Sequence, residues 1–139
     1  MANRYKRKEI LEALYTMMLD VVPEVYTTDR PKVKDSSEQW AIVGLPYGIN
    51  AESSTHNYAN ARIQLFYKDR ENGVENVNSG EELVDKTLAA MDEQLVEGGR
   101  YGHFITCNKN PRVIYFKSDH MGYHAIAIQF ELIISFINN

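Results

Sequence analysis

The clearest pattern in the chain lies between residues 123 and 137, which read YHAIAIQFELIISFI. From Ile126 onward every second side chain is large and apolar, whereas the side chains between them are small or polar until Ile133 and Ile137. An alternation with a period of two predicts a long β-strand that has one face in the core. Because the other face becomes apolar at Ile133 and Ile137, we expect the end of this strand to be covered on both sides.

Other stretches upstream also predict strands. Residues 39–45 (QWAIVGL) are rich in strand-forming side chains, and residues 61–68 (ARIQLFYK) alternate around an exception at Phe66. Residues 101–107 and 112–117 flank the turn-forming sequence NKNP, so we expect these two strands to pair as an antiparallel hairpin. Residues 32–34 could add a short strand.

Two segments have helical spacing. Between residues 5 and 22 the apolar side chains recur every three or four positions, and Pro23 ends the pattern. The second segment opens at Ser79, which forms a capping-box sequence with Glu82. We expect it to continue to the Gly98-Gly99 pair, along an apolar seam of four residues. The seam residues are Val84, Leu88, Met91 and Leu95.

The order of these elements is helix, strands, helix, strands. It predicts an α+β fold in which two helices pack on one face of a largely antiparallel (mixed) β-sheet of about four to six strands. A length of 139 residues predicts a single domain over residues 1–139.

Composition argues against several classes of partner. The net charge is -4, which disfavours nucleic acid as the main partner. No apolar run approaches the roughly 20 residues that span a bilayer, so we expect no membrane partner and synthesis in the cytoplasm. Cys107 is the single cysteine, which excludes an internal disulfide and a cysteine-based metal cage within one chain.

The histidines do not form a recognisable catalytic or metal motif. His120 and His124 are four residues apart, but they lie at a turn into a strand, where this spacing does not bring them together, and no third ligand is identifiable. Glycines follow the second helix instead of preceding it, which is the wrong end for binding phosphate. We therefore expect no catalytic residue, no cofactor and no metal ligand.

The sequence does suggest contact surfaces. The chain has nine tyrosines, a residue type that is enriched at protein interfaces. Residues 46–60 read as a long polar loop, and such loops are commonly functional. We predict interface residues in this loop on one side of the subunit and at the end of the last strand on the other side. These residues are Tyr47, Ile49, Tyr58, Ile133 and Ile137.

The second half of the chain, with ARIQLFYK at 61–68, a capped helix and GYHAIAIQFEL at 122–132, resembles the tail-completion, tail-terminator and head-tail joining proteins of tailed phages. Such proteins assemble as rings, commonly hexameric. The resemblance implies a structural assembly protein of a phage or prophage, found in the tail or neck of the virion. Its implied partners are copies of itself and tail-tube or head-connector proteins.

Two other functions fit the same pattern. One is a small α+β ligand-binding domain or enzyme with a pocket between helices and sheet, where Tyr101, His103, His120 and His124 would be the polar groups. The other is a regulatory adaptor that acts as a dimer.

Overall fold

The computed structural model describes residues 7–27, 38–46, 49–50, 56–92, 95–98, 103–107, 111–118 and 121–135. These residues form two helices and one eight-stranded sheet. In chain order the elements are α1 (Arg7–Leu19), β1 (Val25–Thr27), β2 (Gln39–Gly44), β3 (Ile49–Asn50), β4 (His56–Lys68), α2 (Val77–Asp92), β5 (Leu95–Gly98), β6 (His103–Cys107), β7 (Arg112–Lys117) and β8 (Tyr123–Ser135).

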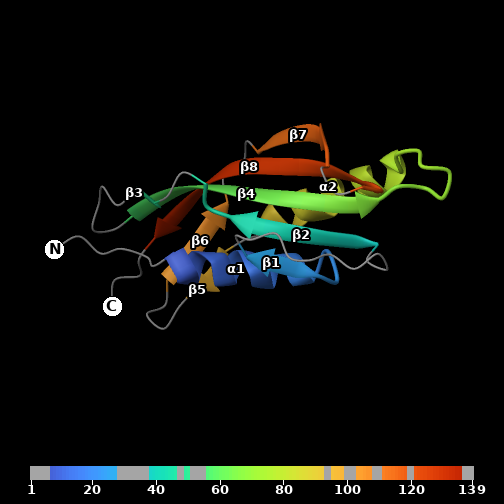
Figure 1. Cartoon of the computed structure of the whole chain (residues 1–139). Coiled ribbons are helices and arrows are strands. Elements are labelled where there is room, and N and C mark those ends of the chain that lie inside the picture. Colours follow the sequence, from blue (N-terminus) through green and yellow to red (C-terminus); the bar gives the residue numbers. More distant parts are fainter. Residues whose placement is uncertain are drawn as a thin grey trace.

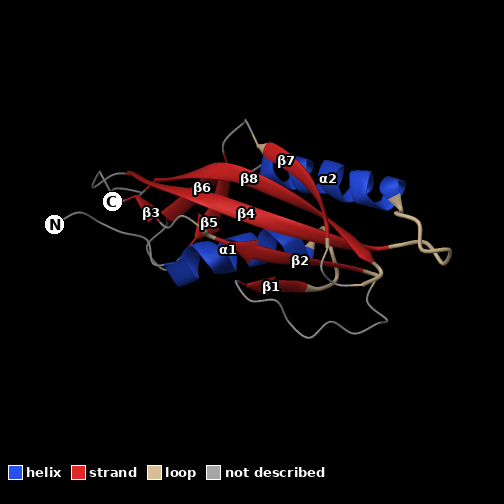
Figure 2. Ribbon diagram, turned by 45° about the horizontal axis from the view of Figure 1, so that its top comes forward, coloured by secondary structure: helices blue, strands red, loops and turns tan. Residues whose placement is uncertain are grey.

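The centre of the sheet is the antiparallel pair of β4 and β8, which are 13 residues each. They stay in register from His56↔Ser135 to Lys68↔Tyr123, and Figures 1 and 2 show them side by side along the molecule. The strand order is β1-β2-β4-β8-β6-β5, with β3 paired to β4 and β7 paired to β8. Among the described strands only the β1–β2 pair is parallel, so the predicted α+β class with a largely antiparallel, mixed sheet is confirmed.

The sheet has eight strands, more than the four to six expected, because short strands extend it. β1 was not predicted, and β5 was read as the end of a helix. The expected loop at 46–60 contains β3 and the first five residues of β4. The possible strand at 32–34 lies outside the described residues.

The expected hairpin of β6 with β7 is wrong. Both strands pair with β8: residues 112–117 with 124–129, and residues 104–107 with 132–135. β6 takes β5 as its other neighbour. The physical reason is that β8 is long enough to offer one edge to two short strands in succession, and backbone hydrogen bonds are satisfied equally well by either neighbour.

The boundaries of α2 also differ from the prediction. The helix is capped by Asn76, whose Oδ1 accepts a hydrogen bond from the Ser79 amide at 3.3 Å. Ser79 is inside the helix and its Oγ accepts a hydrogen bond from Gln39 of β2 at 2.9 Å, so the proposed capping box is not formed. The helix ends at Asp92, and Leu95 belongs to β5 instead of the helix seam.

Both helices cover the same face of the sheet. Their buried side chains, among them Ile10 and Leu14 of α1 and Leu83 of α2, form one core with Ile63 of β4 and Ile128 of β8. We call this the helix face. It agrees with the prediction that two helices pack on one face.

The second face of the sheet has a smaller core. Trp40 of β2 is fully buried and stacks on Phe66 of β4, with ring centroids 3.8 Å apart and an interplanar angle of 2°. Tyr123 and Ala125 of β8 belong to the same cluster. Phe66, which interrupts the alternation of its strand, is therefore buried on this second face.

Candidate functional site

The predicted interface residues fall in three groups. Tyr47 and Ile137 lie outside the described residues. Ile49 is in β3 and Ile133 is in β8, in both cases within the paired sheet. Tyr58 is in β4, and 36% of it is exposed.

The structure brings the last three together at one end of the sheet. Tyr58 is opposite Ile133 in β8, and its neighbour on the other edge is Asn50 of β3. Ile49 is opposite Ala59. The expectation that the 46–60 segment and the end of the last strand form patches on opposite sides of the subunit is therefore wrong, because pairing between β4 and β8 makes them neighbours.

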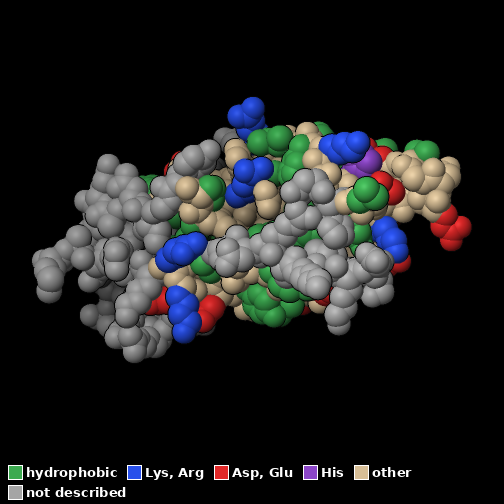
Figure 3. Space-filling view, in the orientation of Figure 1, with side chains coloured by type: hydrophobic (Ala, Val, Ile, Leu, Met, Phe, Trp, Pro, Cys, Tyr) green, Lys and Arg blue, Asp and Glu red, His purple; other side chains and the backbone are tan. Residues whose placement is uncertain are grey.

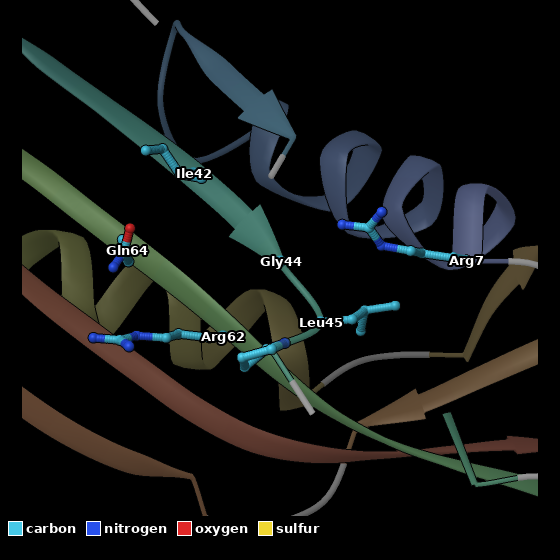
Figure 4. A pocket seen from close by; sticks show the side chains of 7 residues that line it. Arg7, Ile42, Gly44, Leu45, Arg62 and Gln64 are labelled. Atoms are coloured by element: carbon cyan, nitrogen blue, oxygen red, sulfur yellow. The ribbon is translucent and has the colours of Figure 1, made fainter. Parts of the chain in front are cut away.

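A separate feature is a hollow of about 240 Å³ at the end of β2. Figure 4 shows the side chain of Arg7, from the first turn of α1, and that of Arg62, from β4, on either side of Gly44 and Leu45. We call it the Arg62 hollow. Its lining residues are Arg7, Ile42, Gly44, Leu45, Pro46, Arg62 and Gln64.

The floor of the Arg62 hollow follows from strand register. Gly44 is opposite Arg62 and Ile42 is opposite Gln64, which places these residues on the second face of the sheet. Gly44 has no side chain to fill the space above it, and a Cβ added there would meet no atom within 4 Å. The hollow exists because a glycine faces an arginine at this position.

The electrostatics of the hollow favour an anion. The Arg62 guanidinium lies 5.9 Å from the centre of the Phe116 ring. Its Nε is buried and has no hydrogen-bond partner among the described residues. A buried N–H without a partner is destabilising by about 1–3 kcal/mol. The exposed Arg7 adds a second positive charge to the rim.

A polar cluster joins the turn after β4 to the start of β8. His124 Nδ1 lies 2.5 Å from Asp69 Oδ1, and its Nε2 lies 3.6 Å from Glu75 Oε1. The Tyr67 hydroxyl donates to Glu75 Oε2 at 2.7 Å. Burial, followed by this hydrogen bond to a carboxylate, raises the pKa of Tyr67 well above its ordinary value of 10.0.

This cluster fixes local structure. Each carboxylate bonds to a strand residue, and the Asp69 amide donates to the Gly122 carbonyl at 2.8 Å, so the turn is tied to both long strands. The other polar groups of the pocket hypothesis are not seen: Tyr101 and His120 lie outside the described residues, as does the side chain of His103. Among the described residues, no three His, Cys, Asp or Glu side chains are grouped so as to hold a metal ion.

Sequence reasoning missed the Arg62 hollow because its residues come from positions 7, 42–46 and 62–64. One signal was available: Arg62 and Gln64 are two polar residues on the same face of a strand whose next residue on that face is Phe66. In the part of the chain that the structure describes, no helix is both long and apolar enough to cross a membrane.

No protein-family model and no curated protein sequence matches this chain. Solved structures do match. One is a chain from the virion of a native gene transfer agent (GTA) particle, with a TM-score of 0.60 and 9% identity, covering 93% of each chain. Another, which has no descriptive name, has a TM-score of 0.63 and 9% identity and covers 96% of this chain and 95% of the other. At this identity the likeness shows a shared fold.

Proposed function

We propose that the protein is a non-catalytic structural subunit of a phage or prophage particle. In this proposal copies of the chain form a ring that terminates or completes the tail, or joins it to the head. The observation that carries the proposal is the agreement in fold, over 93% of both chains, with a chain of a gene transfer agent virion. The pattern of 61–68 and 122–132, which resembles tail-completion and tail-terminator proteins, supports it independently.

The surface of the subunit is compatible with contacts between protein chains. Large apolar side chains are exposed at several places, including Tyr58, Val74, Val77 and Tyr115. At the end of the sheet formed by β3, β4 and β8, Tyr58 is paired with Ile133, and Ile49 is paired with Ala59, the next residue of β4. Head-to-tail contacts between two different patches of the same subunit close into rings when the rotation is suitable.

The test is electron microscopy of the purified protein mixed with assembled tail-tube protein from the same genome. We expect rings, and a density at one end of each tube that disappears when the protein is left out. An unrelated protein of similar size and charge is the control for adventitious binding. Tubes that remain open at both ends at saturating protein concentrations would contradict the proposal.

A second candidate function, a small-ligand-binding domain, is favoured by one observation, the two arginines that line the Arg62 hollow. A thermal-shift panel of small anions and divalent metals tests it, because a ligand that binds only the native state raises its stability. Saturable stabilisation by one metabolite, together with open tail tubes, would favour this second function.

A further inference from the structure

The turn between β4 and α2 is a projecting part of the subunit with its own backbone hydrogen bonds. Figure 1 shows it at one extremity of the molecule. The Arg70 amide donates to the Val74 carbonyl and the Gly73 amide donates to the Arg70 carbonyl, both at 2.8 Å. Gly73 has a φ of 79°, a conformation that glycine adopts without strain. We call residues 70–74 the 70–74 turn. Its backbone conformation is defined by these two hydrogen bonds within the turn.

The tip of this turn is chemically distinctive. Residues 70–74 are all exposed, and Val74 has 55% of its surface exposed even though it is apolar. Glu71 belongs to the same turn, and the segment from 69 to 86 has six acidic residues against two basic ones. Figure 3 shows acidic side chains at this end of the molecule and several Lys and Arg side chains along the rest of the same face.

The Arg62 hollow has the complementary properties. Its wall is apolar at Ile42, Leu45 and Pro46, and its polar groups are Arg7, Arg62 and Gln64. At about 240 Å³ it is smaller than the roughly 300–1,000 Å³ of sites that bind drug-sized ligands. A space of this size fits one or two side chains, and two positively charged residues, Arg7 and Arg62, line it.

The two features are far apart within one subunit. Arg62 and Asp69 are seven residues apart along β4 and just beyond its end, which corresponds to about 23 Å at the rise of a β-strand. The turn is also tied back to Tyr67 and His124, so it cannot fold over onto its own hollow. The turn of another copy is free of this restriction and can reach the hollow.

We propose that the 70–74 turn of one copy docks in the Arg62 hollow of the next copy. The Glu71 carboxylate lies at the rim beside the positively charged side chains of Arg7 and Arg62, while Val74 contacts the apolar wall beside Leu45. Because the two patches differ, the contact is head-to-tail and can repeat around a ring. This inference rests on the proposed function and specifies which surfaces form the ring.

The first test uses the exposed turn, where substitutions do not disturb folding. Glu71→Arg places a positive charge against Arg7 and Arg62, and we expect the dissociation constant between copies to rise by about ten- to a hundredfold. Glu82→Arg is the matched control, since it makes the same charge change at an exposed position of α2 outside the turn. Analytical ultracentrifugation measures both. Equal behaviour of Glu71→Arg, Glu82→Arg and the wild type would overturn the docking.

The hollow is tested with two variants. Arg62→Gln removes the guanidinium, and Gly44→Leu fills the space, which is free of other atoms around the glycine. Both should weaken self-association as Glu71→Arg does, and circular dichroism establishes that each variant is folded. If Arg62→Gln fails to fold, Gly44→Leu still tests the docking. A folded Gly44→Leu protein that assembles like the wild type contradicts the proposal.

Mixing variants tests the head-to-tail geometry. A copy with Glu71→Arg keeps its hollow and a copy with Gly44→Leu keeps its turn, so the mixture should form a one-to-one pair with twice the mass of one chain and no ring. If the wild type forms rings and the variants form them equally well, only the docking is contradicted. Absence of any self-association of the wild type, with or without tail-tube protein, would contradict both the docking and the proposed function. Displacement of the turn by a small anion that binds the hollow would indicate a ligand site instead.

Discussion

Gly80 is a position where a substitution that normally stabilises a helix should destabilise this protein. It lies in the first turns of α2 and faces the ring of Tyr67. A Cβ built on Gly80 would lie 2.7 Å from Cζ of Tyr67 and 3.0 Å from its hydroxyl oxygen. Tyr67 is 1% exposed and its hydroxyl is held by Glu75, so the ring cannot move aside freely.

Gly80→Ala changes the free energy of unfolding through a favourable helix-propensity term and unfavourable packing terms. Replacing glycine with alanine inside a helix gains about 1 kcal/mol of helix propensity. Overpacking in a core is destabilising by about 1–3 kcal/mol, and displacing Tyr67 from Glu75 would forfeit a hydrogen bond to a charged group, worth about 1.5–3 kcal/mol. We therefore expect Gly80→Ala to lower the free energy of unfolding by about 2 kcal/mol in total.

Urea denaturation followed by circular dichroism measures this change. Asn78→Ala, at an exposed position of the same helix, is the control for propensity and should leave stability unchanged or slightly higher. In a Tyr67→Phe background Gly80→Ala should be less harmful, because the ring is no longer held by Glu75. A Gly80→Ala protein as stable as the wild type would refute the close packing of α2 on β4.

Other expectations follow from the same structure. Leu88→Asp should lower the free energy of unfolding by more than about 3 kcal/mol, because Leu88 packs against the core. Lys86→Asp, at an exposed position, should change it by less than about 0.5 kcal/mol. Equal losses of soluble protein from the two variants would contradict this expectation. Burial and Glu75 raise the pKa of Tyr67, so the folded state holds this proton more tightly than the unfolded state; stability should fall as the pH rises above about 10, by up to about 1.4 kcal/mol per pH unit. Titrating the difference in stability between the wild type and Tyr67→Phe isolates this effect, and a difference that does not change with pH above 10 would contradict it.

The parts of the fold that follow local periodicity could be predicted from the sequence. Both helices, the long last strand and the strand with Ile63 and Leu65 are present where the spacing of apolar residues indicates them. The exception at Phe66 has a physical origin outside its own strand. It is buried against Trp40, because the second face has its own small core.

The rest depends on contacts between distant residues, which local patterns do not specify. Leu95 continues the helical spacing of α2, yet pairing of residues 95–98 with 103–106 places it in a strand. In the same way, the shared edge of β8 decides the partners of β6 and β7, whatever turn lies between them. The Arg62 hollow appears only when Gly44 is placed opposite Arg62.

We expect this chain to act by binding further copies of itself in a ring. Light scattering across the widest accessible concentration range, with and without tail-tube protein, measures this directly. We expect a mass that rises to a whole-number multiple of the chain mass and then stays constant, as in a closed ring. A mass that remains that of one chain at every concentration, including in the presence of tail-tube protein, would contradict it.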